Sequence, residues 1–426
     1  MANPDHSYSK FGTGNKETLL DIPKENGIDI RKELINFHKQ WYSSNIMCLA
    51  IFGKESIDDL EKMALKLFSE VENKNVVLPV WGDNVFLDDQ KGTKIFVVPV
   101  KDSRTLTISF QTPDLDKYYK AGPEHYISHL IGHEGKGSVL SELKSKGWCN
   151  NLVGGNSSSA KGFGFFEVMV DLTEEGFEHV DDILNLVFQY FNLLKRSKPQ
   201  KWIFEEYVKI AEMQFRFKDK ENPLNLVSNL VHSMTTYPLE EALSAPYLIS
   251  EWRPDLIEDL IDRLNPETSR IIIVGQKSAD KCLHTEKWYS TKYGLEKIEQ
   301  SALTNWNSCG TNDKLQLPEP NLFIPTDFTL LPLEADKGYP IIIHDNNVIR
   351  VWFKQDHEFK KPKSFIAFDF SNPIVYSDPI NCNLTHLFVQ LFKDQLSEYL
   401  YDAELAGIKL SVSNTTNGIS VCLIDY

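Results

Sequence analysis

The same order of predicted secondary-structure elements occurs twice in this chain. The matching glycines of the two copies, Gly53 and Gly275, lie 222 positions apart. In each copy an amphipathic helix precedes an apolar run of strand length, at residues 46–52 and 270–274, which ends just before the glycine. We expect each run to be a buried strand. Solenoid units recur every ~20–50 residues, so a repeat of domain length indicates duplicated domains instead.

Apolar residues at helical spacing define the helices of both copies. Ser56 is also a suitable N-cap for the helix that follows the first strand. The apolar residues before that strand are Ile30, Leu34, Phe37 and Trp41, those after it are Leu60, Met63, Leu67 and Phe68, and those of the second copy are Leu256, Leu260, Ile261 and Leu264.

A second pair of matching segments supports the repeat. Residues 141–147 and 399–407 each read as the end of a helix, and each leads through a polar turn to a strand, at 163–170 and 419–424. Gly147 and Gly407 take the same place, which suits a left-handed residue after a helix. With a long helix predicted over 174–195 and short turns between strands, the sequence predicts an α+β fold, in which helices pack on antiparallel-rich sheets.

The charge and the apolar pattern exclude several classes of function. A net charge of -15 argues against nucleic-acid binding, which needs clustered Lys and Arg. The first residues carry no secretory signal, and no apolar run approaches the ~20 residues needed to cross a bilayer. Six scattered cysteines without CxxC spacing predict reduced thiols, a cytoplasmic protein and no cysteine zinc site.

Three histidines at four-residue spacing, His125, His129 and His133, form the most suggestive cluster. On a helix they would share a face, as the ligands of two-histidine zinc sites do. Neither hydrolytic motif is complete, however, because position 130 is Leu and position 132 is Gly where the glutamate base would stand. Two interpretations remain: a non-catalytic metal site and ordinary surface or ligand-facing histidines.

The metal interpretation needs a third ligand from elsewhere in the chain. The candidates for it are Glu205, Glu206 and Glu212. Other chemical signals are weaker, since the turns at 53–56 and 161–164 lack phosphate-loop spacing. The run at 215–220 is interrupted by Asp219 and reads as a solvated helix end.

Residues 152–156 combine an apolar pair with small residues ahead of a polar turn. Such a segment suits an edge strand with accessible backbone, which can accept a peptide as an added strand. An ordinary hairpin arm is the other interpretation, and the residues alone favour it.

Several motifs closely resemble the insulin-degrading-enzyme type of pitrilysin-like inverzincins, a family of zinc metallopeptidases. The matching runs cover nearly the whole chain: residues 9–15, 42–45, 67–76, 129–135, 141–148, 152–155, 215–221, 352–356 and 403–407. The resemblance implies four homologous α+β domains in two halves around a chamber, and a zinc held by an H-x-x-E-H helix that would lie upstream of Met1. It therefore implies a chain that carries no catalytic residue and no cofactor of its own and is inactive alone.

The resemblance also implies domain boundaries. Residues 1–78 are expected to be the end of a first peptidase-like domain and 79–308 a second, inactive one. Residues 309–334 are expected to be a proline-rich linker, and 335–426 the start of an incomplete third domain.

In the family the second domain holds an exosite that anchors the N-terminal end of a peptide. Its positions match His125, His129, Gly132, Glu134, Leu152, Val153 and Gly154. Glu134 can pair with an N-terminal ammonium, and the edge strand can supply main-chain hydrogen bonds. The expected partners are peptides with a free N-terminus, and also a full-length relative or a second copy of this chain.

One departure concerns the segment after the 215–220 run. The family commonly has arginines there that are linked to polyanion binding, whereas this chain reads Glu221, Asn222, Pro223, Leu224 and Asn225. Polyanion activation through this segment is therefore not expected. An alternative function, from another class, is a non-catalytic structural or regulatory partner of a full-length relative.

Overall fold

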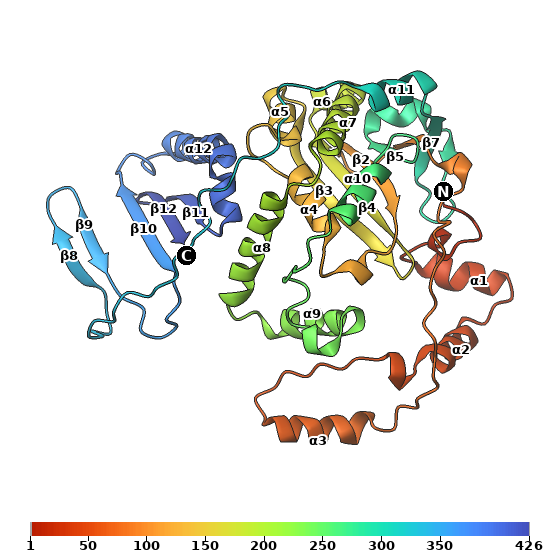
Figure 1. Ribbon diagram of the computed structural model, residues 1–426, viewed down its shortest axis with the longest axis horizontal. Coiled ribbons are helices and arrows are strands. Elements are labelled where there is room, and N and C mark those ends of the chain that lie inside the picture. The colour runs from red at the N-terminus through yellow and green to blue at the C-terminus, as the bar shows by residue number, and fades with distance from the viewer. Residues whose placement is uncertain (1, 426) are drawn as a thin grey trace. The chain divides into compact units, whose positions relative to one another are not determined.

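The computed structural model describes residues 2–425, without the side chains of Ser158, Ser159 and Asp425. The chain divides into two compact units. The first contains the residues up to Ala211 together with Asp219–Pro318, and the second contains Glu212–Lys218 and the residues from Glu319 onward. Figure 1 shows the elements of both units.

The helices and strands of the first unit have the following bounds. The α-helices are α1 (Ile22–Glu25), α2 (Ile30–Trp41), α3 (Ile57–Phe68), α4 (Pro123–Ile131), α5 (Val139–Ser145), α6 (Glu174–Glu178), α7 (Val180–Ser197), α8 (Lys201–Arg216, whose end lies in the second unit), α9 (Pro223–Thr236), α10 (Pro254–Arg263) and α11 (Gln300–Ser308). The strands are β1 (Thr93–Val97), β2 (Thr105–Thr112), β3 (Cys149–Ala160), β4 (Phe163–Leu172), β5 (Arg270–Val274), β6 (His284–Thr285) and β7 (Lys292–Lys297).

These strands form one sheet in the order β3-β4-β2-β5-β1-β7-β6. β1 and β5 are parallel, and every other pairing among the described strands is antiparallel. The prediction of an α+β fold with antiparallel-rich sheets is therefore confirmed. In this order β3 and β6 are the two edges of the sheet.

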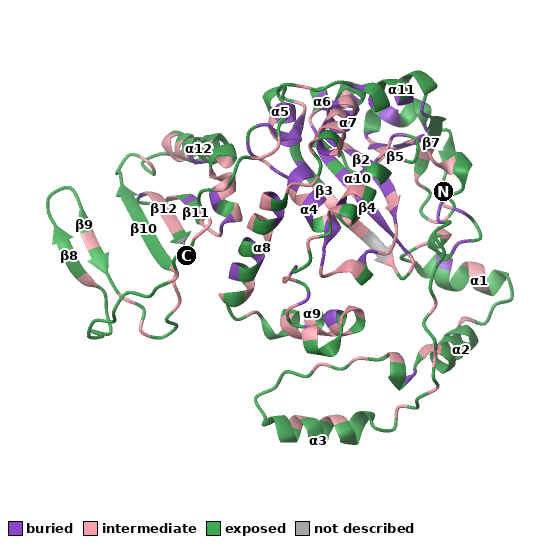
Figure 2. Cartoon of the chain, viewed as in Figure 1, coloured by how far each residue is buried: buried purple, intermediate pink, exposed green. Residues whose placement is uncertain are grey.

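The main core of the first unit lies between this sheet and its helices. Alternate residues of β2, namely Leu106, Ile108 and Phe110, are fully buried, and Phe110 packs edge-on against Phe188 and Phe191 of α7. Burying one such side chain stabilises the fold by ~1.5–3 kcal/mol. Figure 2 shows the buried residues gathered in the sheet and in α4, α5 and α7, while α3 is almost entirely exposed.

The first copy of the repeat agrees with prediction in its helices but not in its strand. α2 and α3 form as expected, and Ser56 caps α3 by accepting a hydrogen bond from the Asp59 amide at 3.2 Å. The prediction of a buried strand at 46–52 is wrong: the segment belongs to no sheet of the described residues, and Phe52 is 60% exposed. An apolar run forms a strand only when a neighbouring strand satisfies its backbone groups.

In the second copy and in the second pair of segments the predicted elements form. β5 is the expected strand, and Gly147 and Gly407 have φ values of 73° and 96°, in the left-handed range predicted for them. The helix predicted over 174–195 is instead two helices, α6 and α7, which meet at His179. The ring of His179 stacks on Trp148 at 4.5 Å, and its backbone leaves the helical conformation.

The second unit holds α12 (Pro379–Leu405), a two-stranded sheet and a three-stranded sheet. The strands are β8 (Ile341–Asp345) with β9 (Arg350–Phe353), and β10 (Ser364–Ser371), β12 (Gly418–Asp425) and β11 (Lys409–Thr415) in that order. All residues of β10 are exposed, and only Val389 and Ala403 of α12 are buried. Between residues 2 and 425, no helix is long and apolar enough to cross a membrane.

Candidate functional site

α4 carries the histidines, and its sequence explains its start and its orientation. Gly122 precedes it at φ 49°, and Pro123 occupies its first turn, where a missing N–H has no cost. The apolar residues Tyr126, Ile127, Leu130 and Ile131 are buried in the core. His125 and His129 therefore lie on the side of the helix that is turned away from the core.

The predicted helical face holds two of the three histidines. His133 lies beyond the end of α4, and its Nδ1 accepts a hydrogen bond from the Gly135 amide at 3.1 Å. The rings of His129 and His133 are perpendicular, with centroids 5.9 Å apart. Burial lowers the pKa of each ring to about 4, and the neighbouring His133 lowers that of His129 further. Both imidazoles are therefore neutral at pH 7.

The residues around these histidines do not fit a catalytic zinc. Leu130 is buried in the core, where the Tyr190 hydroxyl donates a hydrogen bond to its carbonyl at 3.0 Å, and Gly132 has no side chain. Neither position can supply the base that hydrolysis needs. The part of the chain that the structure describes contains no group of three His, Cys, Asp or Glu residues that could hold a metal ion.

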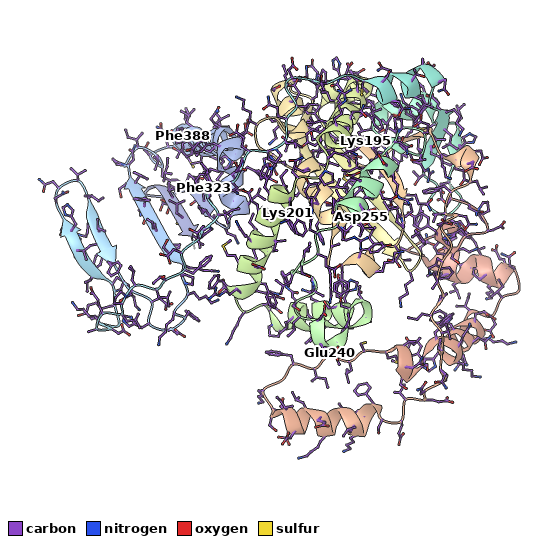
Figure 3. The ribbon with its side chains drawn as sticks, in the orientation of Figure 1. Lys195, Lys201, Glu240, Asp255, Phe323 and Phe388 are labelled. Carbon is purple, nitrogen blue, oxygen red and sulfur yellow. The ribbon has the colours of Figure 1, made fainter. Side chains whose placement is uncertain are left out.

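Of the third ligands considered, Glu205 is engaged elsewhere on α8. Its carboxylate pairs with Lys201 at 2.8 Å, near the start of α8 (Figure 3). α8 presents Tyr207 to the histidines instead, with its ring stacked on His125 at 5.9 Å and 6.2 Å from the ring of His129. Tyr207 thus lies beside His125 and His129, which the sequence analysis did not predict. A tyrosine on a helix does not by itself indicate a functional site.

The end of α4 lies directly against the edge strand β3. A Cβ on Gly154 would lie 2.5 Å from Cγ2 of Ile131, and one on Gly132 would lie 3.9 Å from the backbone N and O of Gly154. These two glycines therefore allow helix and strand to approach almost backbone to backbone. The structure thus brings Gly132 and Gly154, predicted as site residues, into one place.

The remaining predicted residues differ in accessibility. Val153 is 59% exposed and Glu134 is half-buried, so both can meet a ligand. Leu152 is buried in the main core, so its side chain is not available at the surface. β3 pairs with β4 alone among the described strands, which leaves its other edge without a strand partner.

Glu124, in the first turn of α4, is a second residue that sequence reasoning missed. Its side chain is 13% exposed, its Oε1 lies 3.7 Å from His125 Nε2, and its Oε2 is buried without a hydrogen-bond partner. Burial, with a smaller contribution from Asp116, raises the pKa of Glu124 to about 7. Acidic residues are common in the first turn of helices, so the sequence around Glu124 does not indicate a buried carboxyl group.

Comparison with known families and proteins agrees with this architecture. Residues 29–211 match the family model described as the peptidase M16 inactive domain, and residues 215–426 match the middle or third domain of peptidase M16. The chain is 56% identical to insulin-degrading enzyme of Drosophila melanogaster over 100% of its own length and 43% of that protein. It is 48% identical to insulin-degrading enzyme of Homo sapiens, again over 100% of this chain, and 42% of that protein.

Among solved structures, that of pitrilysin aligns with 100% of this chain and 45% of its own, with a TM-score of 0.81 and 26% identity. The chain thus spans less than half the length of these relatives. The sequence-based resemblance is confirmed, and the match to an inactive domain agrees with the missing base at Leu130 and Gly132. This chain therefore belongs to the M16 peptidase family, and it has the pitrilysin-like fold with similarity to insulin-degrading enzymes along its whole length.

Proposed function

We propose that this chain provides the peptide-anchoring and scaffold part of a zinc metalloendopeptidase that degrades peptides, and that it is inactive alone. The observation that carries this proposal is the edge strand β3, which has a described strand partner on one side only, with the end of α4 held against it at Gly132 and Gly154. The second domain, at 79–308, is the anchoring domain in this account.

A peptide bound here adds a strand to the sheet. The free edge of β3 supplies main-chain donors and acceptors, which bind any sequence, and Glu134 supplies a carboxylate for the N-terminal ammonium of the peptide. The nearby histidines do not oppose this charge, because the lowered pKa values of His129 and His133 leave both rings neutral at pH 7.

A second candidate function, a non-catalytic partner of a full-length relative or of a second copy, is favoured by the apolar surface of the second unit. Leu387, Phe388 and Leu391 of α12 are all exposed. Apolar clusters of this kind commonly mark interaction surfaces. Size-exclusion chromatography with and without a full-length insulin-degrading enzyme separates the two candidates, because only the second candidate requires a complex.

We also propose a cytoplasmic location. All six cysteines are free, which suits a reducing compartment. Labelling of the chain in fractionated cells tests this assignment.

Hydrogen exchange on the 426-residue chain tests strand addition. A short peptide with a free N-terminus is expected to slow exchange of the amides along the open edge of β3. The opposite edge strand, β6, is the internal control, because none of the predicted site residues lies on it and its exchange should not change. Equal slowing at both edges, or none at β3, would count against the proposed anchoring site.

A further inference from the structure

A row of side chains crosses the sheet on the face opposite the main core. Successive strand pairings join Val153 to Met169, Met169 to Thr107, Thr107 to Ile272, Ile272 to Ile95 and Ile95 to Leu295. Since the neighbours Val168 and Val170 point into the main core, Met169 points to the other face.

The largest solvent exposure in this row is at its two ends. Val153 is 59%, Met169 47% and Leu295 48% exposed, whereas Thr107 and Ile95 in the middle are buried. The exposed apolar pair of Val153 and Met169 therefore borders the open edge of β3. Leu295 lies at the far end of the same row, on β7.

The opposite face of β3 is bordered by α4, since a Cβ on Gly154 would lie 2.5 Å from Ile131 Cγ2. On the face of Val153, α4 comes close only farther along the strand, where a Cβ on Gly155 would lie 3.3 Å from Ser128 Oγ. Side chains of an added strand alternate between the two faces. Long side chains thus have room on the face of Val153 and Met169.

We propose that Val153 and Met169 form a side-chain subsite that selects a long apolar or aromatic residue of the anchored peptide. The inference rests on the proposed function, since it requires the peptide to lie as a strand beside β3. The peptide residue opposite Val153 has its Cβ ~4.5–5.5 Å from that of Val153. Met169 lies one strand farther, ~10 Å from the peptide backbone, so a Phe or Leu side chain reaches it and an Ala does not.

Methionine suits this position because its flexible thioether adapts to side chains of different shape. Met169 is thereby a specificity residue, while the backbone of β3 supplies the affinity common to all peptides. A Phe at the selected position is expected to bind about three- to tenfold more tightly than an Ala.

The test uses short peptides of alanine and threonine with a free N-terminus, in which a single Phe is moved along the sequence. Fluorescence anisotropy with the full 426-residue chain should show one position at which Phe improves affinity. Met169→Ser should abolish this preference, so that the Phe peptides bind no more tightly than the all-Ala/Thr peptide. Met169→Leu should preserve the preference.

Leu295→Ser is the matched control, because Leu295 has nearly the same exposure on the same face, and it should leave the preference intact. A Phe preference that survives Met169→Ser, or that Leu295→Ser removes equally, overturns the subsite while anchoring at β3 stands. Failure of every peptide to bind overturns the proposed function and the subsite with it.

Discussion

Gly154 of β3 and Ile131 of α4 are so close that a methyl group on the glycine would lie 2.5 Å from Cγ2 of the isoleucine. This approach fixes the end of α4, and Gly132 beyond it, against the open edge strand. The geometry of the candidate site depends on it.

Replacing Gly154 by Ala is expected to lower the free energy of unfolding by ~1–3 kcal/mol, because the added methyl must displace the side chain of a core residue. Urea unfolding followed by circular dichroism measures the change. Gly310→Ala is the control, since a Cβ there meets no atom within 4 Å. Equal stability of the two variants would mean that the helix and strand are not held together as described.

Glu124→Gln is expected to change how stability depends on pH. The pKa of Glu124 is raised from 4.5 to about 7 by burial, so the folded chain holds this proton more tightly than the unfolded chain. Its contribution to stability is therefore greatest below about pH 4.5 and is lost as pH rises through about 7, with a total change of up to ~3 kcal/mol.

Thermal unfolding of the wild type and of Glu124→Gln from pH 5 to pH 8 measures this effect. The wild type should lose stability relative to the variant as pH rises. Glu205→Gln, at an exposed carboxylate on α8, should show no comparable drift. Parallel curves for the wild type and Glu124→Gln would show that Glu124 is not buried as the structure has it.

The purified chain is expected to show no zinc-dependent peptide hydrolysis. Leu130 and Gly132 stand where a glutamate base is required, and no metal-binding group is present among the described residues. Hydrolysis of fluorogenic peptides with and without a chelator checks this. Chelator-sensitive turnover that co-purifies with the chain through several columns would refute it.

Limited proteolysis is expected to cut first between residues 319 and 340. This stretch has no helix or strand. Just before it, Leu315 is buried in the first unit and the Gln316 amide is hydrogen-bonded to the backbone of that unit. The second unit should then be degraded, because β10 is fully exposed and few residues of α12 are buried. Mass spectrometry should identify a resistant fragment that contains His129 and Gly154, and a second unit of equal resistance would contradict this order.

The sequence predicted those features that depend on local rules. The cap at Ser56, the left-handed glycines at 147 and 407 and the strand at 270–274 follow from short-range backbone and side-chain preferences, and the structure contains all of them. The α+β class and the family followed from the alternation of elements and from motif resemblance.

What the sequence could not supply depends on tertiary contacts. The run at 46–52 has the composition of a strand, yet no described strand lies beside it. Tyr207 of α8 stacks on His125 of α4, and the Glu124 side chain has a buried oxygen. Both features arise from tertiary packing, which local patterns do not encode. For Glu134, Val153 and the other site residues, the anchoring role remains a prediction.

Calorimetry with one peptide in two forms, free and acetylated at its N-terminus, tests the anchoring role most directly. In the wild-type chain acetylation should weaken binding by ~1.5–3 kcal/mol, because it removes the ammonium that pairs with Glu134. In Glu134→Gln the two forms should bind alike, and as weakly as the acetylated peptide binds the wild type. Equal affinity of both forms for the wild-type chain would contradict the account.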